Sequence, residues 1–264
     1  MFREKDRRKC EGLFGKYYAG RKFSRGQYED LIAEHVLPGG RLLDAGCGRH
    51  LEFSREFSSI MQVTGIDLEK HLDTQNQMSP FAVRGDLEAL PFPPETFDLV
   101  ISRSVVEHLQ KPFEVFLEFH RVLKPGGKVI FSTPNRYDYV SFVASVTPYA
   151  WHRVMVRKMT GVEEDDVFPT LYRANTLASL GRQLNAAGFR KIVLKAINHY
   201  PSYLMFSPML FRFGTVYERI TSHAWFENLR GTLLCVFKKE GGPEPAAAVV
   251  RQDAATAGGG RVKA

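Results

Sequence analysis

Short apolar runs alternate along this chain with longer segments whose apolar residues recur at helical spacing. Pro112–Leu123 shows the helical pattern, with proline in its first turn and two glycines beyond its end. Similar patterns predict a helix over Phe23–Val36 and another that Asn175 or Thr176 caps and that ends at Gly188. Strands are expected at Arg41–Asp44, Val63–Asp67, Phe81–Asp86, Phe97–Ser102, Lys128–Thr133, Lys191–Ile197 and Thr232–Phe237. This alternation predicts an α/β fold built on an open, mostly parallel sheet.

The first four predicted strands carry polar residues at their ends. Because ligands of open parallel sheets bind outside the carboxyl ends of the strands, we expect one crevice lined by Asp44, Asp67, Asp86 and Ser102. Gly46 and Gly48 would let the chain turn sharply and let backbone N–H groups approach a ligand closely. Asp67, about 20 residues further on, is placed to hold ribose hydroxyls. Asp86 and the Leu87 amide are placed to hold an adenine ring.

The residues after the second glycine bear on which nucleoside would bind. A dinucleotide site needs a third small residue that packs the helix on the strand, but here Arg49-His50-Leu51 follows. A carboxylate directly before the glycines, Asp44, would repel a pyrophosphate and suits the sulfonium and ammonium groups of S-adenosylmethionine (SAM). The alternative for the glycines alone is a tight strand-to-helix turn without any ligand.

Six motifs in order make the ligand interpretation more specific than any one of them. They are Asp44–Gly48 (Asp-x-Gly-x-Gly), Gly65–Leu68, Gly85–Phe92, Phe97–Ser102, Glu107–Leu109 and Leu123–Val129. Together they resemble the class I SAM-dependent methyltransferases, and most of all the small-molecule branch that includes the quinone-biosynthesis enzymes. The resemblance covers roughly Leu31 to Pro134. It implies a Rossmann-like, seven-stranded, mostly parallel sheet with helices on both faces and an antiparallel seventh strand.

The same resemblance implies roles for individual residues. Asp44, Gly46 and Gly48 are predicted to contact the methionine part of SAM. Asp67 and Leu68 are predicted to contact the ribose, and Asp86 and Leu87 the adenine. Ser102 is predicted to line the same crevice. In relatives an N-terminal segment folds over the cofactor, so Tyr17 is a candidate partner of the methionine carboxylate. The alternative for Tyr17 is packing in the core or lid. Cys47 is interpreted as a small packing residue.

Charge and cysteine content narrow the possible binding partners and the cellular compartment. Residues 1–25 carry nine Lys or Arg against three Asp or Glu, whereas the whole 264-residue chain has a net charge of +7. The body is therefore near neutral, which argues against a nucleic-acid face and leaves the basic arm to contact a membrane surface, an anionic substrate or nothing. Three scattered cysteines favour a reduced, cytoplasmic setting and show no metal site. No apolar run is long enough for a membrane span.

We predict three parts in the chain: a basic arm and lid segment at 1–30, a methyltransferase domain at 31–239, and a disordered tail at 240–264. Two aromatic-rich segments, 135–174 and 198–231, interrupt the domain where a substrate must sit, and we expect them to form a substrate cap. The alternative is accessory helices with a small core of their own.

Methyl transfer from a sulfonium needs a nucleophile held in line and, for a hydroxyl, a base that removes its proton. His108 and His199 are the candidate catalytic bases, although His108 matches a family position where histidine is also structural. His152 and Arg153 are further candidate substrate contacts. Enzymes that methylate the amino groups of nucleic-acid bases have an Asn/Asp-Pro-Pro-aromatic motif after the fourth strand, and Ser102–Val105 lacks it. Enzymes that methylate C5 of pyrimidines need a nucleophilic cysteine beside a proline, and the sequence lacks this pair as well.

Three hypotheses follow for the function. The first is an O-methyltransferase of a small metabolite, sugar or lipid-linked acceptor. The second is a C-methyltransferase of a quinone or lipid. The third is a SAM-binding regulatory module without turnover. The sequence leaves the acceptor and the oligomeric state open.

Overall fold

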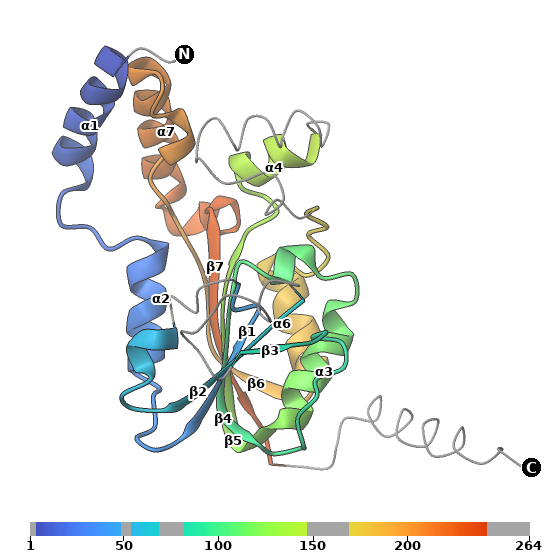
Figure 1. Cartoon of the computed structure of the whole chain (residues 1–264). Coiled ribbons are helices and arrows are strands. Elements are labelled where there is room, and N and C mark those ends of the chain that lie inside the picture. Colours follow the sequence, from blue (N-terminus) through green and yellow to red (C-terminus); the bar gives the residue numbers. More distant parts are fainter. Residues whose placement is uncertain (1–3, 49–53, 69–81, 147–168, 242–264) are drawn as a thin grey trace, which may run out of the picture.

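The computed structural model describes residues 4–48, 54–68, 82–146 and 169–241, and these contain one seven-stranded sheet (Figure 1). The strand order is β3-β2-β1-β4-β5-β7-β6. The strands are β1 (Arg41–Ala45), β2 (Gln62–Asp67), β3 (Ala82–Arg84), β4 (Phe97–Arg103), β5 (Leu123–Pro134), β6 (Phe189–Ile197) and β7 (Thr232–Lys239). β7 runs antiparallel to both of its neighbours, β5 and β6, and the other pairs are parallel. The predicted Rossmann-like sheet with an antiparallel seventh strand is confirmed.

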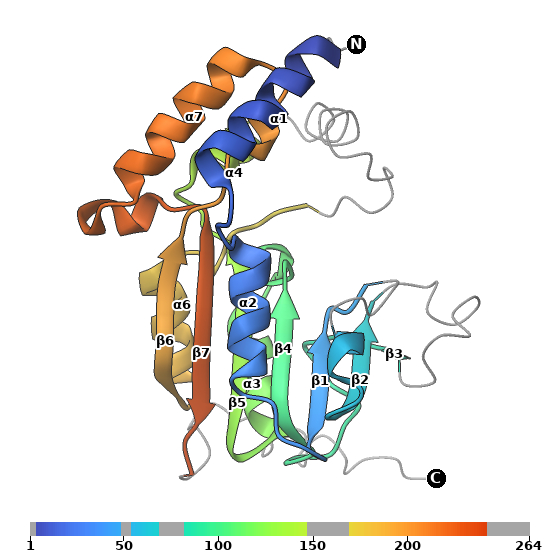
Figure 2. The same cartoon turned by 90° about the vertical axis from the view of Figure 1, so that its left-hand side faces the viewer.

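Helices cover both faces of the sheet, because successive strand residues point to opposite sides. On one face Leu43 and Val100 pack in a cluster with α3 (Pro112–Val122) and α6 (Leu177–Ala186). On the other face their strand neighbours Leu42 and Leu99 pack in a cluster with residues of α2 (Ser24–Ala33). Figure 2 shows α2 in front of the sheet with α3 and α6 behind it. The two buried layers fix the carboxyl ends of the strands relative to one another.

A further group of helices lies beyond the carboxyl ends of the parallel strands (Figures 1 and 2). It comprises α1 (Glu4–Tyr18), α4 (Tyr139–Val146) and α7 (Pro208–Thr221), with the short 3-10 helices η5 (Ser202–Leu204) and η6 (Ala224–Leu229) on either side of α7. Cys10 and Tyr18 of α1 are buried against Phe211 of α7 in a small cluster of their own. Residues 198–231 thus form accessory helices that lie above the strand ends.

Polar contacts also join α1 to α7. The Tyr18 hydroxyl donates to Thr215 Oγ1 at 3.2 Å. Just after α1, the Arg21 guanidinium makes two hydrogen bonds to the buried Glu218 carboxylate, the shorter at 2.7 Å. The basic segment predicted as an arm therefore contains a docked helix. Only Cys10 and Tyr18 of this helix are buried. A helix that buries so few residues needs few apolar positions, so its periodic pattern in the sequence is weak.

The element boundaries differ from the predicted ones by one or two residues at most strands and by more at β5 and β3. β5 begins at Leu123 instead of Lys128, because Leu123 already pairs with Phe97 and the chain passes through an irregularity at Gly126, whose φ is +80°. β3 is shorter than predicted and ends at Arg84, before the Asp86 side chain turns back to accept the Glu88 N–H. The cap of α6 is Thr176, whose side chain accepts the Ser179 N–H at 3.0 Å.

Several predicted features lie outside the described residues. Tyr149, Trp151, His152 and Arg153 of the first insertion are among them, as is the tail from residue 242 onward. Among the described residues, no helix has the length and apolarity needed to cross a bilayer.

A buried histidine beside the sheet makes the free energy of unfolding depend on pH. His120 of α3 is buried and packs edge-on against Phe189, with ring centroids 5.3 Å apart. Burial, and then the Lys239 ammonium, lower its pKa from 6.5 to about 4. The folded chain therefore binds this proton less readily than the unfolded chain, so the stability present above pH 6.5 is lost as the pH falls toward 4.

We expect the free energy of unfolding in urea to fall by about 1–2 kcal/mol between pH 7 and pH 5 through this group. His120→Gln should remove that part of the decline, because glutamine does not titrate. Parallel pH curves for the two proteins would show that His120 does not carry the effect.

Candidate functional site

The glycine loop and the acidic end of β2 meet at the carboxyl edge of the sheet. Gly46 and Gly48 both adopt the left-handed region, with φ of +76° and +62°. The N–H groups of Gly46 and Cys47 donate to Ile66 O at 2.8 and 3.2 Å. The Gly48 N–H donates to Asp67 Oδ2 at 2.8 Å. The Asp67 carboxylate therefore holds the loop in shape and stands beside it, at the place predicted for a ribose.

The turn after β4 lies directly against the glycine loop. A Cβ atom at Gly46 would collide with the side chain of Val105, so this position has no room for a side chain. Val105 precedes the 3-10 helix η3 (Val106–His108). Ser104, just before it, has a φ of +56°, a conformation that is uncommon for a residue with a side chain. Contact with Gly46 thus holds the start of the η3 turn against the glycine loop, at the carboxyl edge of the sheet.

Two predicted crevice residues are tied into the protein interior. Asp44 is 6% exposed and lies close to Tyr28 of α2. Burial of the Tyr28 phenol, and then the negative charge of Asp44, raise the pKa of this phenol well above its ordinary range. The Ser102 hydroxyl is buried and donates to Ala45 O at 2.8 Å, which joins β4 to β1. Tyr28 was not predicted, because a tyrosine within a helix pattern gives no sign of which strand end it will face.

The remaining predicted cofactor residues are spread more widely. Asp86 is exposed and its Oδ1 accepts the Glu88 N–H at 2.9 Å, while Leu87 is buried. Leu68 is exposed at the end of β2. The Tyr17 ring lies in the α1–α7 layer, with the Arg219 guanidinium 5.3 Å from its centroid. The structure therefore brings together Asp44, Gly46, Gly48, Asp67 and Ser102, and it places Tyr17 against α7.

His108 is held by a backbone carbonyl. Its Nδ1 lies 2.9 Å from Pro169 O, and a carbonyl only accepts, so Nδ1 carries the hydrogen. In the neutral ring Nε2 is then the nitrogen that accepts a proton. The Glu107 carboxylate lies 3.9 Å from Nε2 and also accepts from Thr133 Oγ1 at 2.8 Å. Burial raises the pKa of Glu107.

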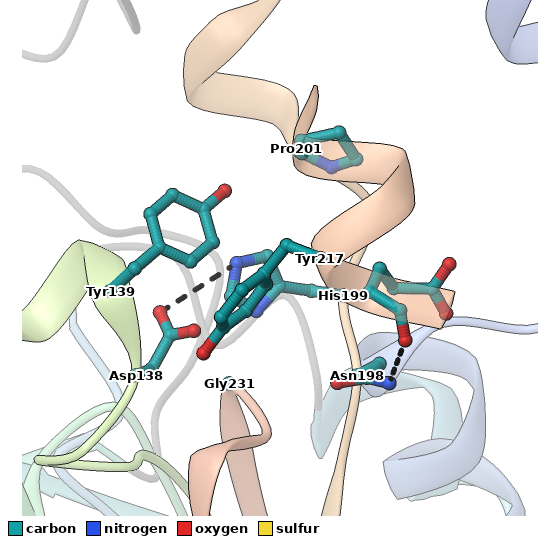
Figure 3. Close-up of a pocket in the computed structure, with 9 residues that line it drawn as sticks. Asp138, Tyr139, Asn198, His199, Pro201, Tyr217 and Gly231 are labelled. Atoms are coloured by element: carbon teal, nitrogen blue, oxygen red, sulfur yellow. Dashed lines mark hydrogen bonds and ion pairs between the residues drawn. The ribbon is translucent and has the colours of Figure 1, made fainter. Parts of the chain in front are cut away.

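His199, the other candidate base, faces Asp138 across a pocket between α4, α7 and the start of β7 (Figure 3). The two side chains point toward one another, with His199 Nε2 3.8 Å from Asp138 Oδ2. The His199 ring lies on Gly231, where a Cβ atom would collide with it. Asp138 is buried and its Oδ2 accepts the Val140 N–H at 3.0 Å at the start of α4, and burial raises its pKa.

Two tyrosines complete this pocket. The Tyr139 ring lies 5.2 Å from that of Tyr217, and the Tyr217 hydroxyl donates to Leu229 O at 2.9 Å. Burial, and then the nearby Asp138, raise the pKa of Tyr217 to about 12 and that of Tyr139 further. Both phenols are therefore neutral at physiological pH. Asp138 was missed in the sequence; its only sign there is an acidic residue before a short apolar helix.

Comparison with known proteins agrees with this fold. The model of a methyltransferase domain family matches residues 43–131. A ubiquinone biosynthesis O-methyltransferase of Burkholderia thailandensis is 30% identical over 175 residues, 62% of this chain and 71% of that relative. A malonyl-[acyl-carrier protein] O-methyltransferase of Erwinia pyrifoliae is 39% identical over 112 residues, 40% of this chain. The chain spans 43% of the length of that second relative.

A solved SAM-dependent methyltransferase from Mesorhizobium loti has the same fold, with a TM-score of 0.52 and 19% identity over 82% of this chain and 98% of that one. The chain belongs to the class I SAM-dependent methyltransferase family. The cofactor of this family is SAM.

The contact between Asp67 and the glycine loop predicts the effect of removing this carboxylate. Asp67→Ala is expected to weaken SAM binding by about 10- to 150-fold, because a charge-assisted hydrogen bond contributes about 1.5–3 kcal/mol. Isothermal titration calorimetry with SAM measures the change.

Asp98→Ala is the matched control. Asp98 accepts from Lys124 Nζ and the Arg41 N–H at the amino end of β4, away from the site. Its removal should lower stability and leave SAM affinity unchanged. Equal affinities for Asp67→Ala and the unmodified chain would show that the ribose lies elsewhere.

Proposed function

We propose that this chain transfers a methyl group from SAM to a hydroxyl of a small metabolite, sugar or lipid-linked acceptor. The observation that carries the proposal is the contact of Val105 with Gly46. The His108 N–H donates to Val105 O at 2.9 Å, so this turn holds a histidine with a defined acceptor nitrogen next to a residue that packs on the glycine loop. Both named relatives are O-methyltransferases, which favours oxygen over carbon as the accepting atom.

The residues at the strand ends fit SAM. The Gly46–Gly48 backbone gives a close approach without side chains, and Asp67 stands beside it with a carboxylate that accepts hydrogen bonds. Asp44 supplies a buried negative charge immediately before the loop, which suits a cationic ligand end. Bound SAM supplies an electrophilic methyl group.

Within this proposal His108 acts as the general base. Its Nε2 accepts the proton of the acceptor hydroxyl as the new carbon–oxygen bond forms, and the methyl carbon–sulfur bond of the sulfonium would break to leave a neutral thioether. Pro169 O keeps the proton on Nδ1, and the Glu107 carboxylate, 3.9 Å from Nε2, stabilises the imidazolium that results. Leu171 and Tyr172 donate their N–H groups to Glu107 O, so the end of the first insertion is anchored at this turn.

His199 is the second candidate for the same role. Its Nε2 has no hydrogen-bond partner among the described residues and faces the Asp138 carboxylate. His199 follows β6, at the edge of the sheet remote from β1, and Asp138 follows β5, whereas His108 follows β4, which pairs with β1. Proximity to the glycine loop therefore favours His108.

The acceptor class is tested with purified protein and methyl-labelled SAM on a panel of phenols, sugars, hydroxylated lipids and malonyl-acyl carrier protein. Transfer to a hydroxyl gives an ether whose label survives mild base and is released by ether-cleaving reagents, whereas transfer to the malonyl carboxylate gives an ester whose label mild base releases. A label that resists both treatments would identify C-methylation instead. SAM binding with no transfer to any class would favour a regulatory module.

A further inference from the structure

The outward face of α7 is apolar. Met209, Phe213, Val216 and Ile220 recur at helical spacing and are 63%, 64%, 52% and 50% exposed; we refer to them as the α7 stripe. The opposite face of the same helix carries the buried Phe211, Thr215 and Glu218. Proteins that are monomeric in water seldom expose several adjacent apolar side chains on one helix face, so this patch indicates an interaction surface.

Two aromatic residues continue this surface beyond the helix. Trp225 of η6 is 95% exposed, and Phe226 beside it is 42% exposed. Tryptophan combines a large apolar ring with an N–H group, and it is enriched where one end of the side chain is apolar and the other is hydrated. An almost fully exposed tryptophan in η6, an element that contacts α7 just after the α7 stripe in the chain, therefore points to an interface between water and an apolar phase.

Basic residues border the stripe on the side of α1. Arg212 and Arg219 lie three residues after Met209 and Val216, which places them next to the stripe on the helix surface. The Tyr17 ring connects the two helices, with the Arg219 guanidinium 5.3 Å and Lys16 Nζ 5.8 Å from its centroid.

The positive charge continues along α1. Lys5, Lys9 and Lys16 share one face of that helix by their spacing, and all three are exposed. The result is an apolar stripe on α7 with a cationic border to which α1 contributes. Residues 1–25, which include α1, carry most of the net positive charge of the chain.

We infer that the α7 stripe, Trp225 and this cationic border form a docking surface for an anionic lipid bilayer. Amphipathic helices with apolar residues on one face and basic residues at its edge lie in the interface of such membranes. A second copy of the chain is a poorer occupant, since symmetric pairing through this face would bring the arginines and lysines of both copies together. The inference does not depend on which hydroxyl is methylated. It places the bilayer next to the helices above the strand ends.

Vesicle binding by the full chain tests the inference. The chain has two tryptophans, so Trp151→Phe leaves Trp225 as the sole tryptophan, whose emission is excited selectively over that of the tyrosines. We expect its emission to shift to shorter wavelength with vesicles of phosphatidylcholine and phosphatidylglycerol, and bromine-labelled lipid to quench it. Vesicles of phosphatidylcholine alone, or high salt, should reduce both effects. An unshifted emission with anionic vesicles would overturn the inference.

Two paired variants separate the apolar and charged contributions. Phe213→Ser with Ile220→Ser should weaken partitioning by at least about ten-fold, and Lys16→Glu with Arg212→Glu by roughly five-fold or more for each charge. Leu37→Ser, at a residue of similar exposure (52%) between α2 and β1, is the matched control and should leave binding unchanged. Circular dichroism verifies that each variant is folded.

Two outcomes would overturn the inference at this stage. One is a loss of binding with Leu37→Ser as large as with the α7 pair. The other is a dimer in light scattering without lipid that Phe213→Ser with Ile220→Ser dissociates, because the face would then join two copies of the chain.

Discussion

His108→Asn is expected to lower kcat by about 100- to 10,000-fold, the usual contribution of a positioned general base. The asparagine amide N–H takes the place of Nδ1–H and keeps the hydrogen bond to Pro169 O, so the variant removes the accepting nitrogen and preserves the anchor of the turn. Affinity for SAM and the melting temperature should stay close to those of the unmodified chain. Steady-state kinetics with a hydroxyl acceptor measures the loss.

A pH profile separates a chemical role for His108 from a structural one. A general base makes the rate depend on pH, so His108→Asn should flatten one limb of the profile if His108 is that base. His199→Gln is the companion variant. If it removes the pH-dependent limb while His108→Asn keeps it, the base is the histidine that faces Asp138, and our assignment is wrong.

Gly46→Ala is expected to destabilise the protein by about 2–5 kcal/mol, since left-handed backbone costs a residue with a side chain about 1–2 kcal/mol and overpacking adds about 1–3. The added methyl group would meet Val105, which packs directly on this glycine. Because the same loop carries the Gly48 N–H to Asp67, SAM affinity should fall as well. Urea unfolding and calorimetry measure the two effects.

Gly39 supplies a control with matched backbone. Its φ of +75° equals that of Gly46 within a degree, yet nothing lies within 4 Å of a Cβ placed there. Gly39→Ala should therefore cost only the backbone part, about 1–2 kcal/mol. Val105→Ala combined with Gly46→Ala should recover the overpacking part, as expected of residues in contact. Equal losses at Gly39 and Gly46 would show that Val105 does not matter.

The sequence predicted the parallel strands well, because each strand is a short apolar run that leads into a polar residue or a turn. It placed Asp67 opposite the glycine loop by spacing alone. It did not predict that Asp67 bonds to Gly48, or that the Ser102 hydroxyl is taken up by Ala45 O, since a residue type does not reveal which of several near partners a side chain will choose.

Contacts between distant segments were beyond the sequence pattern. Asp138 and His199 are far apart in the chain and meet only because β5 and β6 flank β7. The helix α1 was missed for a similar reason: its few apolar residues are matched by Phe211, almost 200 residues away. Such pairs depend on the finished topology, which local periodicity does not contain.

The position of β7 has a consequence for the order in which the chain acquires structure during synthesis. This last strand lies between β5 and β6 and is the sole sheet neighbour of β6. Until the ribosome has released residues 232–239, β5 presents an open edge and β6 has no strand to pair with. From the synthesis of β5 (Leu123–Pro134) until that of β7 (Thr232–Lys239), the nascent chain therefore carries an unpaired strand edge, and this is the stage at which cellular chaperones would protect it from aggregation.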